Sequence, residues 1–181
     1  MIDINVENIV VSTQLAEKLD IKSLAEKIPD SKYNPDEFPG LILHFEEPKT
    51  AALIFSSGKV ICTGAKTVEQ ANETITKIIN EMKNQGLDTP DEIEVTTQNI
   101  VASADLKKDL QLSSIAKGLL LENVEYEPEQ FPGLVYKIDD TGTVILLFSS
   151  GKMVCTGAKK MDDVHRAIDT MKDKLSSLGV L

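Results

Sequence analysis

The sequence is poor in the residues that build metal centres and disulfide frameworks. Its 181 residues include two cysteines, two histidines and no tryptophan. Two cysteines alone cannot build a disulfide framework or a four-ligand zinc site. So few metal-binding side chains argue against a metal enzyme, and we expect neither a metal nor a cofactor.

The sequence also lacks long apolar runs and an excess of positive charge. No stretch of about 18 apolar residues occurs, which excludes a membrane-spanning helix. The first residues, MIDINVENIVV, contain no basic stretch and no small-residue cleavage site, so we expect a cytoplasmic protein without a secretory signal. The formal net charge is −10 and Arg166 is the only arginine. This balance argues against a generally basic surface of the kind that binds nucleic acids.

What the sequence has instead is an internal repeat. Residues 55–66 read FSSGKVICTGAK, and residues 148–159 read FSSGKMVCTGAK, with ten of twelve positions identical. The string FPGL at 38–41 returns at 131–134 with the same offset of 93. We therefore divide the chain into a first repeat, 1–90, and a second repeat, 91–181. Two copies predict a pseudo-twofold molecule that presents one surface patch twice, whereas a solenoid normally stacks three or more units.

Hydrophobic periodicity predicts the same elements in both repeats. In the first repeat, β-branched and alternating patterns predict strands over residues 4–11, 41–46, 51–55 and 60–65. Helical spacing predicts a segment over 14–28 with a break near Asp20, and a long amphipathic helix over 67–84 that buries Val68, Ala71, Ile75, Ile78, Ile79 and Met82. The second repeat ends with a helix over 161–178. The fold class is α+β, an antiparallel sheet with helices on one side.

Alternate residues of these strands are apolar on both faces of the predicted sheet, although one set of helices is available to cover them. The second face carries a few small polar groups, which are Asn8, Thr63, Asn99 and Thr156. Such a face is either a partner site or a surface buried by a dimer or by helices placed wrongly here. Cys62 and Cys155 fall on the other face, and we expect them in the core beneath the long helices.

The DNA minor groove would suit this second face. Its walls are sugar and base edges on which apolar side chains pack, and Asn and Thr can meet the acceptors of A·T pairs. Four phenylalanines recur in pairs at turns or strand ends: Phe38, Phe55, Phe131 and Phe148. There a ring can project as a wedge between base steps; the alternative for each is ordinary core packing.

The repeated FPGL…FSSGK…CTGAK pattern resembles the TATA-box-binding protein family, and its archaeal form in particular. Each copy is preceded by a Y-x-P-x-x-F segment and by an N-I-V strand, so the resemblance covers nearly the whole chain. It implies a saddle of two α+β repeats, in which one continuous curved antiparallel sheet carries its helices on the convex side. The resemblance also implies that the concave face of that saddle binds and bends promoter DNA.

The resemblance also implies a role for individual residues. The kinking wedges fall on the four repeated phenylalanines, and the central hydrogen-bonding pairs fall on Asn8 with Thr63 and Asn99 with Thr156. Apolar groove contacts fall on Val10, Leu53, Ile61, Val101, Leu146 and Val154. Backbone phosphate contacts fall on Ser57, Lys59, Lys137, Ser150 and Lys152. The acidic contact with transcription factor B falls on Glu127 and Glu129.

The first repeat departs from the family pattern. Asp36 and Glu37 stand where many members carry basic residues, and His44 stands where an arginine is often found. Lys59 and Lys66 are then expected to supply most phosphate contacts of this repeat. We also expect the acidic residues to lie on the helices and the connector, and the salt dependence of DNA binding to be shallow.

These observations predict a general transcription initiation factor that is not an enzyme. It would recruit transcription factor B directly and RNA polymerase indirectly, form a homodimer when free of DNA, and associate with the archaeal nucleoid. The alternative is a scaffold whose apolar sheet face binds a polypeptide.

Overall fold

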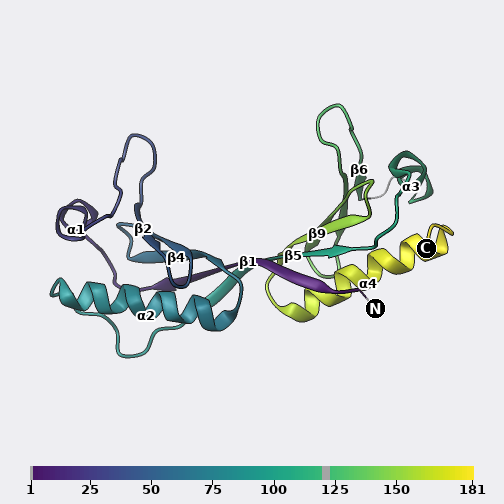
Figure 1. Ribbon diagram of the computed structural model, residues 1–181. Helices are drawn as coiled ribbons and strands as arrows, with labels where there is room; N and C mark the ends of the chain where they lie inside the picture. The colour runs from purple at the N-terminus through teal and green to yellow at the C-terminus, as the bar shows by residue number, and fades with distance from the viewer. Residues whose placement is uncertain (1, 120–122) are drawn as a thin grey trace. The chain divides into compact units, whose positions relative to one another are not determined.

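The computed structural model describes residues 2–119 and 123–181, which form two compact units (Figure 1). The first unit is Asn8–Gln98, and the second unit is Met1–Glu7 together with Asn99–Leu181. Residues 1–7 of the first repeat therefore belong to the second unit, and residues 91–98 of the second repeat belong to the first unit. None of the helices among the described residues is long and apolar enough to cross a membrane.

Each unit is an antiparallel sheet with a short and a long helix. In the first unit the strand order is β2-β3-β4-β1, and in the second it is β5-β9-β8-β7-β6. The first repeat contains β1 (Ile4–Gln14), α1 (Ile21–Lys27), β2 (Leu41–Phe45), β3 (Thr50–Ile54), β4 (Lys59–Ala65) and α2 (Val68–Asn84). The second repeat contains β5 (Thr96–Asp105), α3 (Leu112–Gly118), β6 (Val124–Glu125), β7 (Leu134–Ile138), β8 (Thr143–Leu147), β9 (Lys152–Ala158) and α4 (Met161–Ser177).

The prediction of helical structure over 14–28 is wrong for its first half. Strand β1 continues to Gln14, which pairs with Lys59 of β4. Residues 15–19 then run alongside the β3–β4 turn. The Leu15 and Leu19 backbone amides donate to the carbonyls of Gly58 and Ser56 in this turn at 2.9 and 2.8 Å. Both leucines are buried, so their four-residue spacing imitates a helix. The helix begins only at Ile21, capped by the Asp20 carboxylate.

The two long helices are confirmed to within one residue at each end. Thr67 caps α2 by accepting the Gln70 amide at 3.1 Å. The predicted buried face is largely correct, because Ala71, Ile75, Ile78 and Met82 are buried. Two predicted residues are exceptions: Ile79 is half-buried, and Val68 lies in the first turn with 52% of its surface exposed. Thr74, which the pattern left out, is fully buried instead.

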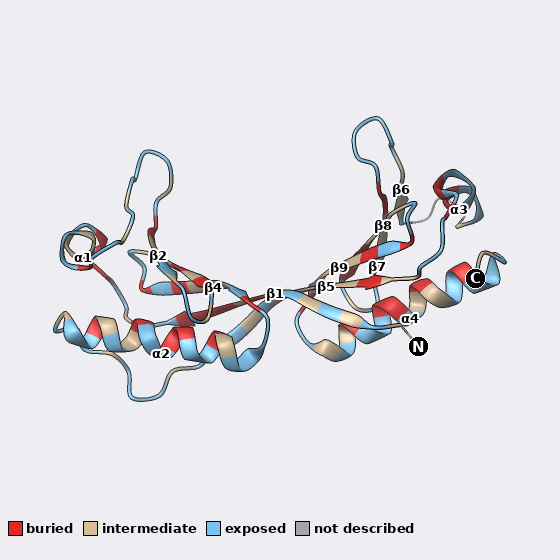
Figure 2. Cartoon of the chain, viewed as in Figure 1, coloured by how far each residue is buried: buried red, intermediate tan, exposed pale blue. Residues whose placement is uncertain are grey.

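Each sheet buries one face and leaves the other partly open. Helices α2 and α4 each lie along one side of their own unit's sheet (Figure 1). Strand residues on that side, such as Ala52, Ile54 and Cys62, are fully buried, and the residues between them are half-buried (Figure 2). Within the described parts of the chain, no second layer of helices covers the open face. The reading in which helices were placed wrongly is therefore excluded.

Candidate nucleic-acid interface

The open face of each sheet carries an apolar row that runs across its strands. In the first unit, Leu53 of β3 pairs with Ile42 on one side and with Ile61 on the other. In the second unit, Leu146 of β8 pairs with Val135 and Val154 in the same way. The sequence singled out the residues of β3, β4, β8 and β9, but it missed Ile42 and Val135. Strand alternation placed Ile42 on this face, yet only the pairing register shows that it continues the row.

Each row ends on a serine of the neighbouring strand. Ser12 pairs with Ile61, and Ser103 pairs with Val154. Ser12 accepts a hydrogen bond from the Gln98 amide at 2.7 Å, whereas Ser103 donates to the Glu7 carboxylate at 2.7 Å. The second row therefore has an acid at its edge, although the acidic residues are expected to concentrate on the helices and the connector.

Val10 and Val101 lie at matching irregularities in β1 and β5. The β1–β4 register shifts between Ile9 and Val11, and the β5–β9 register shifts between Ile100 and Ala102. The residues on both sides of each shift are buried, while each valine is half-buried. Both valines therefore lie on the open face, as predicted.

The two predicted polar pairs are formed. Asn8 Nδ2 donates to Thr63 Oγ1 at 3.0 Å, and Asn99 Nδ2 donates to Thr156 Oγ1 at 3.2 Å. The Asn8 and Asn99 carbonyl oxygens each accept a backbone amide, from Gly64 and Gly157, at 2.7 Å. These bonds fix which side of each carboxamide is the donor. Each side-chain amide nitrogen carries two hydrogens, and only one of them is used in a hydrogen bond among the described residues.

The four repeated phenylalanines come together as two pairs. Phe38 and Phe55 stand edge to face with centroids 5.7 Å apart, and Phe131 and Phe148 do the same at 5.9 Å. The rings are half-buried apart from Phe131, which is 38% exposed. A Phe buried in the core would be covered far more completely. The core-packing alternative therefore does not describe these rings.

Glycines lie directly beneath both aromatic pairs. A Cβ on Gly40 would come within 2.7 Å of Phe38 Cε2, and one on Gly133 would come within 2.8 Å of Phe131 Cε2. The loops that carry the outer rings are closed by the Phe38 and Phe131 amides, which donate to the carbonyls four residues earlier at 2.9 Å. The repeated FPGL string therefore encodes a loop and the space in which its ring packs.

The predicted phosphate ligands are exposed at the β3–β4 and β8–β9 turns. Ser57 and Ser150 lie in the turns, and Lys59 and Lys152 begin the following strands. Gly58 and Gly151 have φ near +90°, and a Cβ there would come within 1.8 and 2.4 Å of the carbonyl oxygens of the segments that follow β1 and β5. The turns are thus held against those segments.

The remaining predicted residues lie near the far ends of the sheets. Lys137 is exposed on β7 and forms an ion pair with Glu125 at 3.7 Å. Its equivalent in the first repeat is His44, which is exposed on β2. Glu127 and Glu129 are exposed in the loop between β6 and β7. Figure 1 shows this loop in green, on the side of its sheet away from α4.

The two cysteines lie away from the open face. Cys62 and Cys155 lie on the helix-covered face, as predicted, and burial raises the pKa of both thiols. The pKa of Cys155 rises to about 11, while a hydrogen bond from the Thr74 side chain opposes the rise at Cys62. Both thiols are therefore protonated at neutral pH and unsuited to nucleophilic chemistry.

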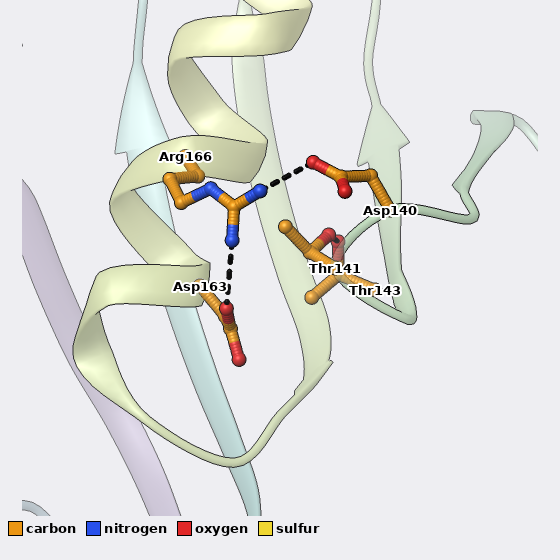
Figure 3. Close-up of polar contacts among 5 residues, drawn as sticks. All are labelled: Asp140, Thr141, Thr143, Asp163 and Arg166. Atoms are coloured by element: carbon orange, nitrogen blue, oxygen red, sulfur yellow. Dashed lines mark hydrogen bonds and ion pairs between the residues drawn. The ribbon is translucent and has the colours of Figure 1, made fainter.

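The only arginine is engaged away from the open face. Arg166 of α4 pairs with Asp140 in the β7–β8 turn and with Asp163 one turn earlier on the helix, the latter at 3.6 Å (Figure 3). Beside it the hydroxyls of Thr141 and Thr143 are bonded to each other. This cluster joins α4 to the hairpin, and lysine is left as the cation for the interface.

Comparison with known proteins identifies the family. The family model described as "Transcription factor TFIID (or TATA-binding protein, TBP)" matches residues 3–85 and again residues 94–178. The chain belongs to the TATA-binding protein family. It is 52% identical to the TATA-box-binding protein of Archaeoglobus fulgidus over 178 residues, which cover 98% of this chain and 97% of the relative. It is 51% identical to that of Thermoplasma acidophilum, again over 98% of this chain and 97% of the relative.

A solved structure of the same family has the same fold. The Methanococcus jannaschii TBP is 46% identical and superposes with a TM-score of 0.87, covering 97% of this chain and 99% of that chain. The α+β fold class predicted from the sequence and the resemblance to archaeal TATA-binding proteins are both confirmed. The roles assigned to single residues stay predictions.

Proposed function

We propose that this chain is a general transcription initiation factor that binds A·T-rich promoter DNA in the minor groove and kinks it with its paired phenylalanines. The observation that carries the proposal is the open face of each sheet. On it an apolar row, an asparagine with an unused amide hydrogen and a partly exposed aromatic pair occur together. Membership of the family supports the same assignment.

Preference for A·T pairs follows from the donors on this face. Asn8 and Asn99 present N–H groups because their carbonyl oxygens are occupied by glycine amides. The minor groove of an A·T pair offers only acceptors, and a G·C pair adds the guanine amino group. At a G·C pair the free N–H of Asn8 or Asn99 would face the N–H of the guanine amino group, which is also a donor. The surrounding aliphatic row offers no acceptor for the guanine N–H.

Bending follows from the aromatic pairs. An exposed ring braced edge to face by a second ring, with a glycine below, is a stiff apolar wedge. Inserting such a wedge unstacks a base step at a cost of a few kcal/mol, which is offset by the surface that bent DNA brings into contact. Flexible A·T-rich steps reduce that cost further.

We assign the binding of transcription factor B to the loop between β6 and β7. Glu127 and Glu129 project from an exposed loop and supply an acidic patch for transcription factor B, through which RNA polymerase would be recruited. Without DNA, the apolar rows are uncovered, and a homodimer would hide them. In cells we place the protein on the chromosome in the cytoplasm. The two repeats 1–90 and 91–181 act as one DNA-binding unit.

A protein-binding scaffold is the competing function, because the same rows could receive an apolar polypeptide. The two functions differ in what Phe148 contacts. If Phe148 is a wedge, its replacement weakens DNA binding. If the sheet is a protein-binding scaffold, the same replacement weakens binding of the polypeptide, and the protein does not distinguish between DNA duplexes.

The test is fluorescence anisotropy with two labelled duplexes, one with a TATA-like octamer and one with a G·C-rich octamer. We expect selective binding of the first, and a loss on the order of tenfold to a hundredfold in Phe148→Ala, as for a central aromatic contact. Phe45→Leu is the matched control, since Phe45 lines a hollow between β2 and α2 on the other side of the sheet. Equal affinity for both duplexes, or equal losses in both variants, would contradict the proposal.

A further inference from the structure

The second unit contains a hollow beside the predicted phosphate ligands. It has a volume of about 880 Å³ and its lining includes Lys107, Lys152, Ser103, Ser150 and Phe148. Two lysines and two serine hydroxyls therefore line one hollow next to the Phe148 ring. Lys107 was not among the residues that the sequence singled out.

The loop that carries Lys107 is held in place. The Asp105 carboxylate accepts the Lys107 amide at 2.8 Å, and the Leu106 and Leu110 amides donate to the carbonyls of Gly151 and Ser149 at 2.9 and 2.8 Å. Lys107 has φ +57°, a conformation that costs a lysine energy and suits asparagine or glycine better. A lysine kept in this backbone conformation, in a loop pinned to the turn, points to a role for its charge.

The equivalent place in the first unit is built differently. There the hollow is about 270 Å³, and its lining includes Ser12, Gln14 and Lys59. The side-chain amide of Gln14 donates to the backbone carbonyls of Ser57 and Ala16 at 2.6 and 2.7 Å. These bonds connect the turn to the segment after β1. Ala16 occupies the position of Lys107, so this unit has one lysine where the other has two.

Two acids, Asp3 and Asp105, line the larger hollow together with its two lysines, so its formal charges balance. The Asp105 carboxylate is held on the loop by the bond that it accepts from the Lys107 backbone amide. Asp3 lines it from the exposed start of the chain. The groups that approach from the turn itself are Ser150 and Lys152, and an anion there would meet lysines from two segments together with hydroxyl donors.

We propose that Lys107 contacts a DNA backbone phosphate at this hollow, so that the second unit makes a phosphate contact that the first unit lacks. The inference rests on the proposed function, because the anion is part of the bound duplex. A lysine that neutralises one phosphate releases about one counterion, which adds about 0.9 to the steepness of the salt dependence. Phosphate contacts strengthen binding to every sequence alike, so Lys107 raises affinity without adding base selectivity.

The experiment measures the affinity for the TATA-like and G·C-rich duplexes at several salt concentrations. Lys107→Asn removes the charge and relieves the backbone conformation, so thermal stability should be unchanged or slightly higher. We expect its salt slope to be shallower by about one, with a several-fold weaker affinity at low salt and an unchanged ratio between the duplexes. Lys107→Arg should restore the slope.

Lys174→Gln is the control for net charge, because Lys174 is exposed in the last turn of α4. An unchanged slope in Lys107→Asn, or an equal change in Lys174→Gln, would overturn the assignment of Lys107 and leave the proposed function standing. Failure of the wild-type protein to select the TATA-like duplex would instead overturn the proposed function, and this contact with it.

Discussion

At the scale of single residues, the wedge depends on atoms that are missing as much as on the rings. Gly133 allows the Phe131 and Phe148 rings to lie over the backbone, where a Cβ would be 2.8 and 3.0 Å from them. Real Cβ atoms do not approach other atoms that closely, so a methyl group must displace the outer ring. The two nearest atoms belong to side chains, while the Leu147 carbonyl oxygen, 3.3 Å away, is a tight backbone contact that would have to give by a few tenths of an ångström.

We therefore expect Gly133→Ala to weaken binding of the TATA-like duplex by roughly tenfold while changing the free energy of unfolding by less than about 1 kcal/mol. Anisotropy titration and urea unfolding measure the two effects separately. Gly40→Ala provides the same test under Phe38 and Phe55. Unaltered affinity in both variants would show that ring position does not matter for binding.

At the scale of elements, the long helices are held to the sheets through cores that include one thiol each. Burial keeps the Cys155 thiol protonated, with its pKa raised from an ordinary 9.0 to about 11. The unfolded chain releases this proton at lower pH than the folded chain does. The stabilising contribution is therefore fully present below about pH 9, and it is lost as the pH rises towards 11.

The expected loss from this thiol is about 2 kcal/mol across that range, since each unit of pKa difference corresponds to about 1.4 kcal/mol. Urea unfolding at several pH values between 8 and 11 measures it, and Cys155→Ala separates the contribution of this thiol from that of the rest of the chain. The variant should be less stable at pH 8 but lose less stability on raising the pH. Parallel pH profiles for the two proteins would refute the prediction.

The elements also show which parts of the fold can be predicted from sequence. Helices α2 and α4 and the repeated hairpins follow from local periods and turn residues, so they were predicted closely. Residues 15–19 were not, because their backbone partners lie some forty residues away in the β3–β4 turn. Ile42 joined the candidate site only through the register of β2 against β3, and Lys107 only through the loop pinned to Gly151.

At the scale of the whole molecule, a protein of formal net charge −10 has to bind a polyanion. The cations near the candidate interface are few: Lys59, Lys66, Lys107, Lys137 and Lys152 are exposed, and Lys137 is paired with Glu125. Glu7 adds a negative charge beside Ser103 at the end of the second apolar row. We therefore expect electrostatic attraction to be a small part of binding and apolar contact with bent DNA to be the larger part.

The small number of lysines near the interface sets the expected salt dependence of DNA affinity. Five lysines that each release about 0.9 counterion give a plot of log affinity against log salt with a slope of about −4.5 or shallower. Affinity measured between about 0.1 and 1 M potassium chloride should then fall gradually, and selectivity for the TATA-like duplex should persist, because base contacts and wedges do not depend on counterions. The G·C-rich duplex serves as the control for non-specific attraction. A slope near −10, typical of proteins that neutralise many phosphates, would mean that basic residues outside this face bind the DNA.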